Sequence, residues 1–258
     1  MNSFSSKHLI QHDATILLSS FAILTFLLPI GGKIDQFLIR PWINSAGQFY
    51  LNDNWYLNYW NHDIFKYVLI VIYACFLFLW ILSFFIEKLK SQRFLYGYMF
   101  LMSSLSTALI GFIKSQSSHA CPIHMLKNSS TGFIWDFSAT DGQCFPGGHA
   151  STGFALISGF FVYRLSQHKR AKMFLMFGLG IGFILGWGQM MRGQHFLSHN
   201  LWTAWFIYAF NSVVFAVLAY KFPEKLSSTS MNDHPHLNLS SDRLVNLFHR
   251  SKKHNPMQ

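Results

Sequence analysis

Charged residues are scarce in this chain, which excludes an ordinary water-soluble domain. Asp, Glu, Lys and Arg together make up 12% of the 258 residues, about half the share usual in soluble proteins. Hydrophobic residues make up 51%, with 28 Phe and 8 Trp, a balance that favours contact with lipid. We therefore expect an integral membrane protein.

Three further features are absent: a nucleic-acid-binding module, a signal-peptide cleavage site and a metal-binding motif. The net charge of +10 is spread over linkers and a tail without a nucleic-acid-binding module, so nucleic acid is not an expected partner. The first apolar run lacks a small-x-small cleavage site after it, so we expect it to stay in the protein as a membrane helix. Recognised metal-ligand spacing and nearby carboxylates are lacking around His119, His124, His149, His195 and His199. No metal or other cofactor is therefore expected.

Long apolar runs are what the sequence has in abundance. A bilayer core of about 30 Å requires about 20 apolar residues in each helix. Six runs are candidates, of which the fourth is short: 14–30, 65–86, 94–113, 149–163, 173–190 and 199–220. The sequence thus predicts an all-α polytopic membrane protein, in which residues 1–222 form one domain of six transmembrane helices with a helical-bundle core.

Basic residues predict the orientation of these helices. Lys7, the linkers 88–93 and 164–172 and the tail after 221 share one side, which the positive-inside rule assigns to the cytoplasm together with both termini. The opposite side is then extracytoplasmic, or periplasmic if the chain lies in the inner membrane of a Gram-negative cell. On that side the aromatic-rich segment 31–63 predicts short interfacial helices, either as an anchoring belt or as a lid.

The tail, residues 223–258, is rich in Ser, Asn and His and is expected to be mostly disordered. Within it, residues 241–254 combine apolar and basic side chains. They predict either an amphipathic helix on the anionic inner leaflet or a solvated segment.

Four residues suited to phosphate chemistry stand where an apolar run meets a polar one. Lys114 ends the third run, His149 begins the fourth, Arg192 ends the fifth and His199 begins the sixth. Alternating helices place all four on the outer side. Each alone also fits a side chain that reaches the headgroups, but together they predict a site for a phosphate ester. Gly147 and Gly148 precede His149, so backbone N–H groups at the start of a helix would also face an anion.

The cysteines predict one covalent link. Cys121 and Cys144 both lie in the outer loop between the third and fourth helices, and an oxidising compartment would let them pair. Such a disulfide would stabilise the loop by about 3 kcal/mol in the chain-entropy model. Cys75 lies within the second apolar run and is interpreted as a packing residue.

These residues resemble the type-2 phosphatidic acid phosphatases, integral membrane lipid phosphatases related in site design to vanadium haloperoxidases. The pattern of that family is Lys, six residues, Arg-Pro; then Pro-Ser-Gly-His; then Ser-Arg, five residues, His, three residues, Asp. Here the blocks run from Lys114 to Pro122, from Pro146 to His149 and from Met191 to Thr203. The resemblance covers the third to sixth helices, a little over a third of the chain.

The chain departs from this pattern at four positions, and its last block is one residue longer between Arg192 and His199. The family's residues Arg, Ser, Ser and Asp are replaced here by Cys121, Gly147, Met191 and Thr203. A divergent bacterial branch is similar to this chain, with His-x-Cys-Pro in the first block and Arg-Gly-x-His-Phe-x-Ser-His in the third.

The resemblance implies a mechanism. His199 would attack phosphorus to form a phosphohistidine, His149 would protonate the departing oxygen, and water would release phosphate. The oxygens of the phosphoryl group would be held by Lys114, Arg192 and the amides of Gly147 and Gly148. Ser198 would cap the sixth helix and so direct His199.

Several residues are candidates for supporting roles. Thr203, Asp136 and Asp141 are alternatives for the aspartate that orients the nucleophile in the family. His119 and His195 would assist at the phosphate, support a residue that contacts it, or reach the lipid headgroups.

The expected function is a metal-independent phosphatase acting on a lipid phosphate monoester or diphosphate, with the bilayer and a lipid substrate as its partners and no obligate protein partner. Candidate substrates include phosphatidic acid, phosphatidylglycerol phosphate, polyprenyl diphosphate and the phosphates of lipid A. Two alternatives are a lipid phosphotransferase that uses the same site and a catalytically inactive relative that binds or transports lipid.

Overall fold

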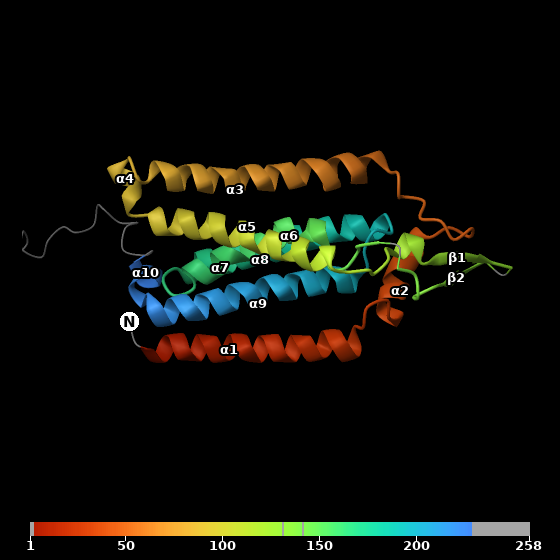
Figure 1. Ribbon diagram of the computed structural model, residues 1–258, viewed down its shortest axis with the longest axis horizontal. Helices are drawn as coiled ribbons and strands as arrows, with labels where there is room; N and C mark the ends of the chain where they lie inside the picture. Colours follow the sequence, from red (N-terminus) through yellow and green to blue (C-terminus); the bar gives the residue numbers. More distant parts are fainter. Residues whose placement is uncertain (1–2, 131, 141, 229–258) are drawn as a thin grey trace, which may run out of the picture.

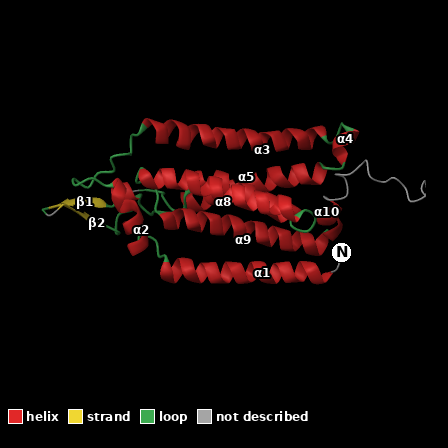
Figure 2. Cartoon of the chain, turned by 180° about the vertical axis from the view of Figure 1, so that it is seen from behind, coloured by secondary structure: helices red, strands yellow, loops and turns green. Residues whose placement is uncertain are grey.

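The computed structural model describes residues 3–130, 132–140 and 142–228, and most of them are helical (Figure 1). The long helices are α1 (Ser3–Ala22), α3 (Phe65–Leu82), α5 (Arg93–Ser115), α8 (His168–Met191) and α9 (Leu197–Lys221). They lie side by side along the longest axis of the molecule (Figures 1 and 2). Within the described residues, 5 helices are long and apolar enough to cross a membrane, two of them extended by the π-helical turns Ile23–Leu27 and Leu57–Ile64. The chain is therefore a polytopic, nearly all-α protein.

The outer faces of these helices carry large apolar side chains. Phe26 is 77% exposed, Phe78 61% and Val213 61%. In water such a surface would be unfavourable, whereas lipid solvates it. This pattern agrees with a bundle surrounded by hydrocarbon.

The fourth predicted helix, 149–163, differs from the expectation. It consists of α6 (Gly148–Phe154), a 3₁₀ turn (Ala155–Ile157) and α7 (Ser158–Tyr163), with lengths of 7, 3 and 6 residues. At 1.5 Å per residue this segment rises about 24 Å, less than the bilayer core of about 30 Å. It lies inside the bundle, where Phe154 and Phe161 are fully buried. In the part of the chain that the structure describes, five helices are therefore of membrane length, and the fourth predicted helix is present as a shorter, broken segment inside the bundle.

Glycine permits this internal segment to pack closely on α8. A Cβ atom placed on Gly153 would lie 2.5 Å from the backbone nitrogen of Gly182, and one on Gly182 would lie 2.2 Å from the Phe154 ring. Only glycine leaves room for this approach, as is common between membrane helices.

The two ends of the bundle are different. One end carries α4 (Glu87–Lys90) and α10 (Pro223–Ser228), and the other carries α2 (Lys33–Ile39) and an antiparallel hairpin (Figures 1 and 2). The hairpin, β1 (Leu126–Ser129) and β2 (Gly132–Trp135), pairs Leu126 with Trp135 and is the described chain's departure from an all-helical fold. At this end a small apolar cluster closes over the helices and contains Ile39, Ile43, Phe49, Ala120, Met125 and Phe196.

The start of the tail is ordered. α10 begins at Pro223, a residue that suits the first turn of a helix, and its Leu226 is fully buried in the main core. Residues 229–258, which include the expected amphipathic helix 241–254, lie outside the described residues.

A buried ion pair lies between α1 and the end of α7. Arg164 contacts Asp13 at 3.0 Å through Nη1 and at 2.7 Å through Nη2, and both side chains are 3% exposed. The hydroxyls of Tyr208 and Ser212 donate to the same carboxylate at 2.8 and 3.1 Å. Charged residues within membrane bundles normally pair in this way, so the pair fixes α1 against the rest of the core.

Candidate active site

The segments that carry His149 and His199 are adjacent at the end of the bundle near α2. The backbone N–H of Gly147 donates to the carbonyl oxygen of His199 at 3.3 Å. The Thr203 hydroxyl donates to the carbonyl of Gly147 at 3.0 Å. The start of α6 is thus attached to the first turns of α9, and both histidines lie at the same end of the molecule.

Lys114, in the last turn of α5, lies over the start of α6. A Cβ atom placed on Gly148 would lie 3.5 Å from Lys114 Nζ, an ordinary contact. Gly148 is the first residue of α6, where backbone N–H groups are not used by the helix. An ammonium group and a helix start therefore meet at one point, which favours an anion.

Gly147 has no room for a side chain. A Cβ atom on it would lie 2.5 Å from Asn200 Oδ1, and its own amide already donates to His199. The expected phosphate role of the Gly147 amide therefore does not agree with the geometry. The packing also explains why glycine stands where the resembling motif has serine.

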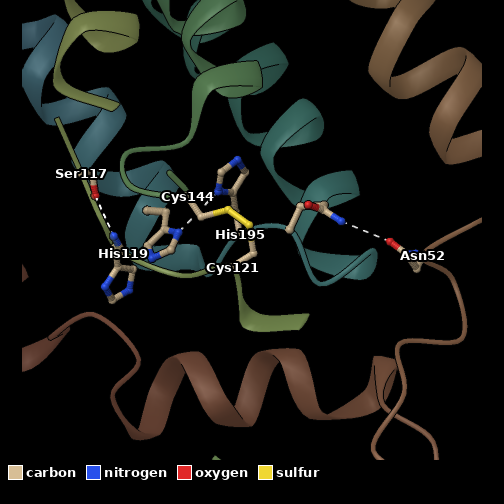
Figure 3. The surroundings of a disulfide bond; sticks show 8 residues. Asn52, Ser117, His119, Cys121, Cys144 and His195 are labelled. Atoms are coloured by element: carbon tan, nitrogen blue, oxygen red, sulfur yellow. Dashed lines mark hydrogen bonds between the residues drawn. A yellow bond between two sulfur atoms is a disulfide. The ribbon is translucent and has the colours of Figure 1, made fainter. Parts of the chain in front are cut away.

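Three imidazoles cluster beside the start of α6. Figure 3 labels two of them, His119 and His195. The third, His199, is fully buried, and its Nδ1 lies 3.4 Å from Nδ1 of His195, which is 2% exposed. The His119 ring centroid lies 5.1 Å from that of His199 in an edge-to-face arrangement. Among the described residues, neither Nε2 of His199 nor Nε2 of His119 has a hydrogen-bond partner. The cluster thus presents ring nitrogens that the protein itself does not use.

Burial keeps two of these histidines neutral. Loss of water lowers the pKa of His195 to about 3, with a further contribution from the nearby charge of Lys114, while a hydrogen bond with the Cys144 backbone opposes the shift. Burial also lowers the pKa of His119. Both rings are therefore neutral near pH 7 and can each donate one N–H and accept one hydrogen bond.

Arg192 follows α8, where the helix ends in a Schellman turn. Gly193 has a φ of +76°, its N–H donates to Met190 O at 2.9 Å, and that of Gln194 donates to Gln189 O at 2.9 Å. The guanidinium donates from Nε to Asn52 O at 3.1 Å and from Nη1 to the Gln189 side chain at 3.2 Å. These bonds direct Arg192 toward the segment around Asn52 and use two of its five N–H groups.

A disulfide links Cys121 and Cys144, with a Cα to Cα distance of 5.0 Å (Figure 3). The Cys144 N–H donates to the carbonyl of His119 at 2.9 Å. The link therefore holds the segment of His119 against the segment that leads into α6. Cys75 is exposed and has a free thiol, so it is not the buried packing residue that the sequence suggested.

The candidates for an orienting aspartate are placed elsewhere. The Thr203 hydroxyl lies 2.8 Å from the His199 carbonyl oxygen and 3.0 Å from that of Gly147, and in the described chain neither ring nitrogen of His199 bonds to it. Asp136 pairs with Lys127 in the hairpin, which lowers its pKa to about 2. Asp141 lies outside the described residues.

Asp35 is a site element that the sequence did not reveal. Its buried carboxylate accepts hydrogen bonds from the Ser198 backbone N–H at 3.0 Å, from the Ser198 hydroxyl and from the Gly31 N–H at 2.9 Å. Burial raises the pKa of Asp35, and these bonds oppose the rise. Ser198 is therefore not the N-cap residue that was expected. That position is Phe196, which makes no side-chain cap, and Asp35 of α2 accepts from the first turn of α9 instead.

The fold and the site together define a polytopic membrane protein with buried imidazoles and a lysine at one end of its bundle, an arrangement that suits a phosphate ester. Residues 94–223, half of the chain, match the family model described as the PAP2 superfamily, and the chain belongs to this superfamily. The family implies phosphatase-type activity on phosphate esters. No curated protein and no solved structure matches the chain. The matched range contains Lys114, His119, His149, Arg192, His195 and His199.

Proposed function

We propose that this protein hydrolyses a lipid phosphate monoester or diphosphate at the extracytoplasmic face of the membrane, with His199 as the nucleophile. The observation that carries the proposal is the buried Nε2 of His199, which has no hydrogen-bond partner in the described chain and lies within a group of neutral rings and Lys114. An imidazole attacks through an unprotonated nitrogen, so this atom suits the role.

The reaction proceeds in two steps. The lone pair of His199 Nε2 forms a bond to phosphorus while the bond from phosphorus to the lipid oxygen breaks, and His149 gives a proton to that oxygen. Water then attacks the phosphohistidine, His149 accepts a proton, and phosphate leaves as His199 regains its lone pair.

Lys114 and the Gly148 amide, which meet at the start of α6, stabilise the phosphoryl oxygens. Arg192 donates to the phosphoryl oxygens from the N–H groups that do not bond to Asn52 or Gln189. His119 donates from its buried Nε2 and supplies a donor in the block where Cys121 stands for the family's arginine.

A lipid substrate fits the surroundings of the site. An apolar groove of about 320 Å³ lies between α1, α8 and α9, and Leu28 and Leu201 line its end nearest the site. Leu201 and His199 lie on different faces of α9 but both in its first turns, so a hydrocarbon chain in the groove would bring its headgroup to the depth of the imidazole cluster. The basic linkers lie at the opposite end of the bundle, which supports an extracytoplasmic site.

The test is phosphate release by the purified protein from phosphatidic acid, phosphatidylglycerol phosphate and a polyprenyl diphosphate, with EDTA present. We expect His199→Ala and His149→Ala to lower turnover at least about 1,000-fold. His168→Ala, at an exposed residue of the opposite end, is the matched control and should be fully active. Undiminished turnover of His199→Ala would reject the proposal, and labelled lipid products distinguish hydrolysis from transfer to a second lipid.

A further inference from the structure

His195 and His199 face each other through the same ring atom. Their Nδ1 atoms are 3.4 Å apart, and the rings meet at 70° with centroids 5.6 Å apart. His195 belongs to the turn before α9, and His199 to its first turn. Two facing ring nitrogens form a hydrogen bond only when one carries the proton and the other a lone pair.

The surroundings decide which ring carries that proton. Nε2 of His199 is buried and has no partner among the residues that the structure describes. A proton there would be a buried donor without an acceptor, which costs about 1–3 kcal/mol. A proton on Nδ1 is satisfied by His195. The Cys144 backbone is a hydrogen-bond partner of both rings, so it gives His195 an acceptor for its own ring proton and offers His199 a second acceptor beside His195.

We infer that His195 is the positioning residue of the nucleophile: its Nδ1 accepts the Nδ1 proton of His199 and thereby keeps the reactive lone pair of His199 on Nε2. The inference rests on the proposed function. His195 thus orients the nucleophile, the role for which Thr203, Asp136 and Asp141 were candidates. It lies four residues before His199, whereas the aspartate of the family motif lies four residues after the nucleophile.

The charge of the site supports a histidine in this role. The pKa of about 3 keeps the His195 ring neutral, so its lone pair is present throughout the pH range in which a membrane enzyme works. A neutral acceptor also leaves the positive charge of Lys114 uncompensated. The full charge of Lys114 then acts on the phosphoryl group instead of on a carboxylate beside the nucleophile.

Two nearly isosteric variants test the acceptor. In His195→Asn the amide oxygen stands at the same number of bonds from Cβ as Nδ1, whereas His195→Leu has a similar shape and no acceptor. With phosphatidic acid in mixed micelles, we expect His195→Leu to lower kcat about 100-fold with KM within about twofold, and His195→Asn to stay within about tenfold of the wild type. Equal activity of the Leu variant and the wild type would overturn the inference, as would equal losses in both variants when both melt like the wild type.

A second measurement does not depend on catalysis. In protein labelled with ¹⁵N-histidine, two-bond ¹⁵N–¹H correlations report the tautomer, and the His199 signals are those that His199→Ala removes. We expect His199 to carry its proton on Nδ1 in the wild type and in His195→Asn, and to lose this preference in His195→Leu. A wild-type proton on Nε2, or an unchanged tautomer in His195→Leu, contradicts the positioning role. If the wild type releases no phosphate from any lipid, the proposed function fails while the tautomer still decides the role of His195.

Discussion

The carboxylate of Asp35 accepts hydrogen bonds from both the backbone N–H and the hydroxyl of Ser198, although 163 residues separate the two in sequence. Asp35 belongs to α2, a short helix at the end of the bundle that carries the hairpin (Figure 1). Ser198 immediately precedes His199 in α9. The contact therefore ties the outer segment to the turn of α9 that carries the proposed nucleophile. It gives α2 a specific role that an anchoring belt would not have.

Replacing Asp35 by Ala should destabilise the protein and reduce its activity. The change removes the acceptor of buried N–H and O–H groups, so we expect the free energy of unfolding to fall by about 2–4 kcal/mol. Turnover should fall about tenfold, because a misplaced reacting group is costly even when it moves by about 1 Å. Melting temperature and phosphate release of the purified protein measure both effects.

Ser198→Ala is the control for this prediction. It removes the hydroxyl bond and keeps the backbone bond to Asp35, so its cost should be nearer 1 kcal/mol. An Asp35→Ala variant that melts and turns over like the wild type would show that the contact does not position α9.

The stability of the protein should fall in acid because of His195. Its pKa is about 3 in the folded chain and about 6.5 when unfolded, so between these values the unfolded state binds a proton that the folded state does not. The stabilisation is complete above pH 6.5 and is lost as the pH falls toward 3, by up to about 1.4 kcal/mol for each pH unit. His119, whose pKa is also lowered, adds a loss of the same sign.

Melting curves of the wild type and His195→Asn between pH 7.5 and 4 measure this dependence. Carboxylates titrate in both proteins, so only the difference between the two slopes belongs to His195. The Asn variant should lose less stability on acidification. Parallel slopes would mean that His195 is protonated equally easily in the folded and unfolded chains.

The helices were predictable because their signal is local. An apolar run of sufficient length predicts a membrane helix without knowledge of its neighbours, and α5, α8 and α9 match the expected runs 94–113, 173–190 and 199–220 within a few residues. The run 149–163 is shorter, and whether such a run is a membrane helix or an internal one depends on what surrounds it. The run is buried because it packs against α8, and the hydrophobic pattern of the sequence does not predict this tertiary contact.

The site was predictable only in part for a similar reason. Alternating helices brought Lys114, His149 and His199 to one end of the molecule, because this follows from chain direction alone. The bonds of Arg192 to Asn52 and the facing rings of His195 and His199 depend on how a turn folds and which segment covers it. Such contacts leave no spacing pattern in the sequence.

The disulfide should hold His119 in the site. Cys121→Ser with Cys144→Ser releases a loop of sequence separation 23, for which the chain-entropy model gives a loss of about 3 kcal/mol. We expect a lower melting temperature and, because the Cys144 N–H holds the His119 carbonyl, a lower turnover. Cys75→Ser is the control and should change neither, since that thiol is exposed and unpaired. Free thiols at 121 and 144 in the native protein, measured by mass spectrometry without reductant, would contradict the link.

Restoring the family's serine at position 147 should damage this protein rather than improve it. A Cβ atom at Gly147 would lie 2.5 Å from Asn200 Oδ1, so Gly147→Ser must push α6 away from α9 or turn Asn200 out of its buried position. We expect at least a tenfold loss of phosphate release and a loss of about 1–3 kcal/mol of stability, as for other overpacked sites. Gly180→Ala, where nothing lies within 4 Å of the added atom, is the matched control and should be tolerated.

A second experiment tests whether the conflict is with the Asn200 side chain alone. Asn200→Ala should then restore much of the loss when combined with Gly147→Ser, and a double-mutant cycle measures this coupling. Additive losses in the cycle would show that Gly147 and Asn200 do not constrain each other, and the replacement of the motif's serine would then need a different physical cause.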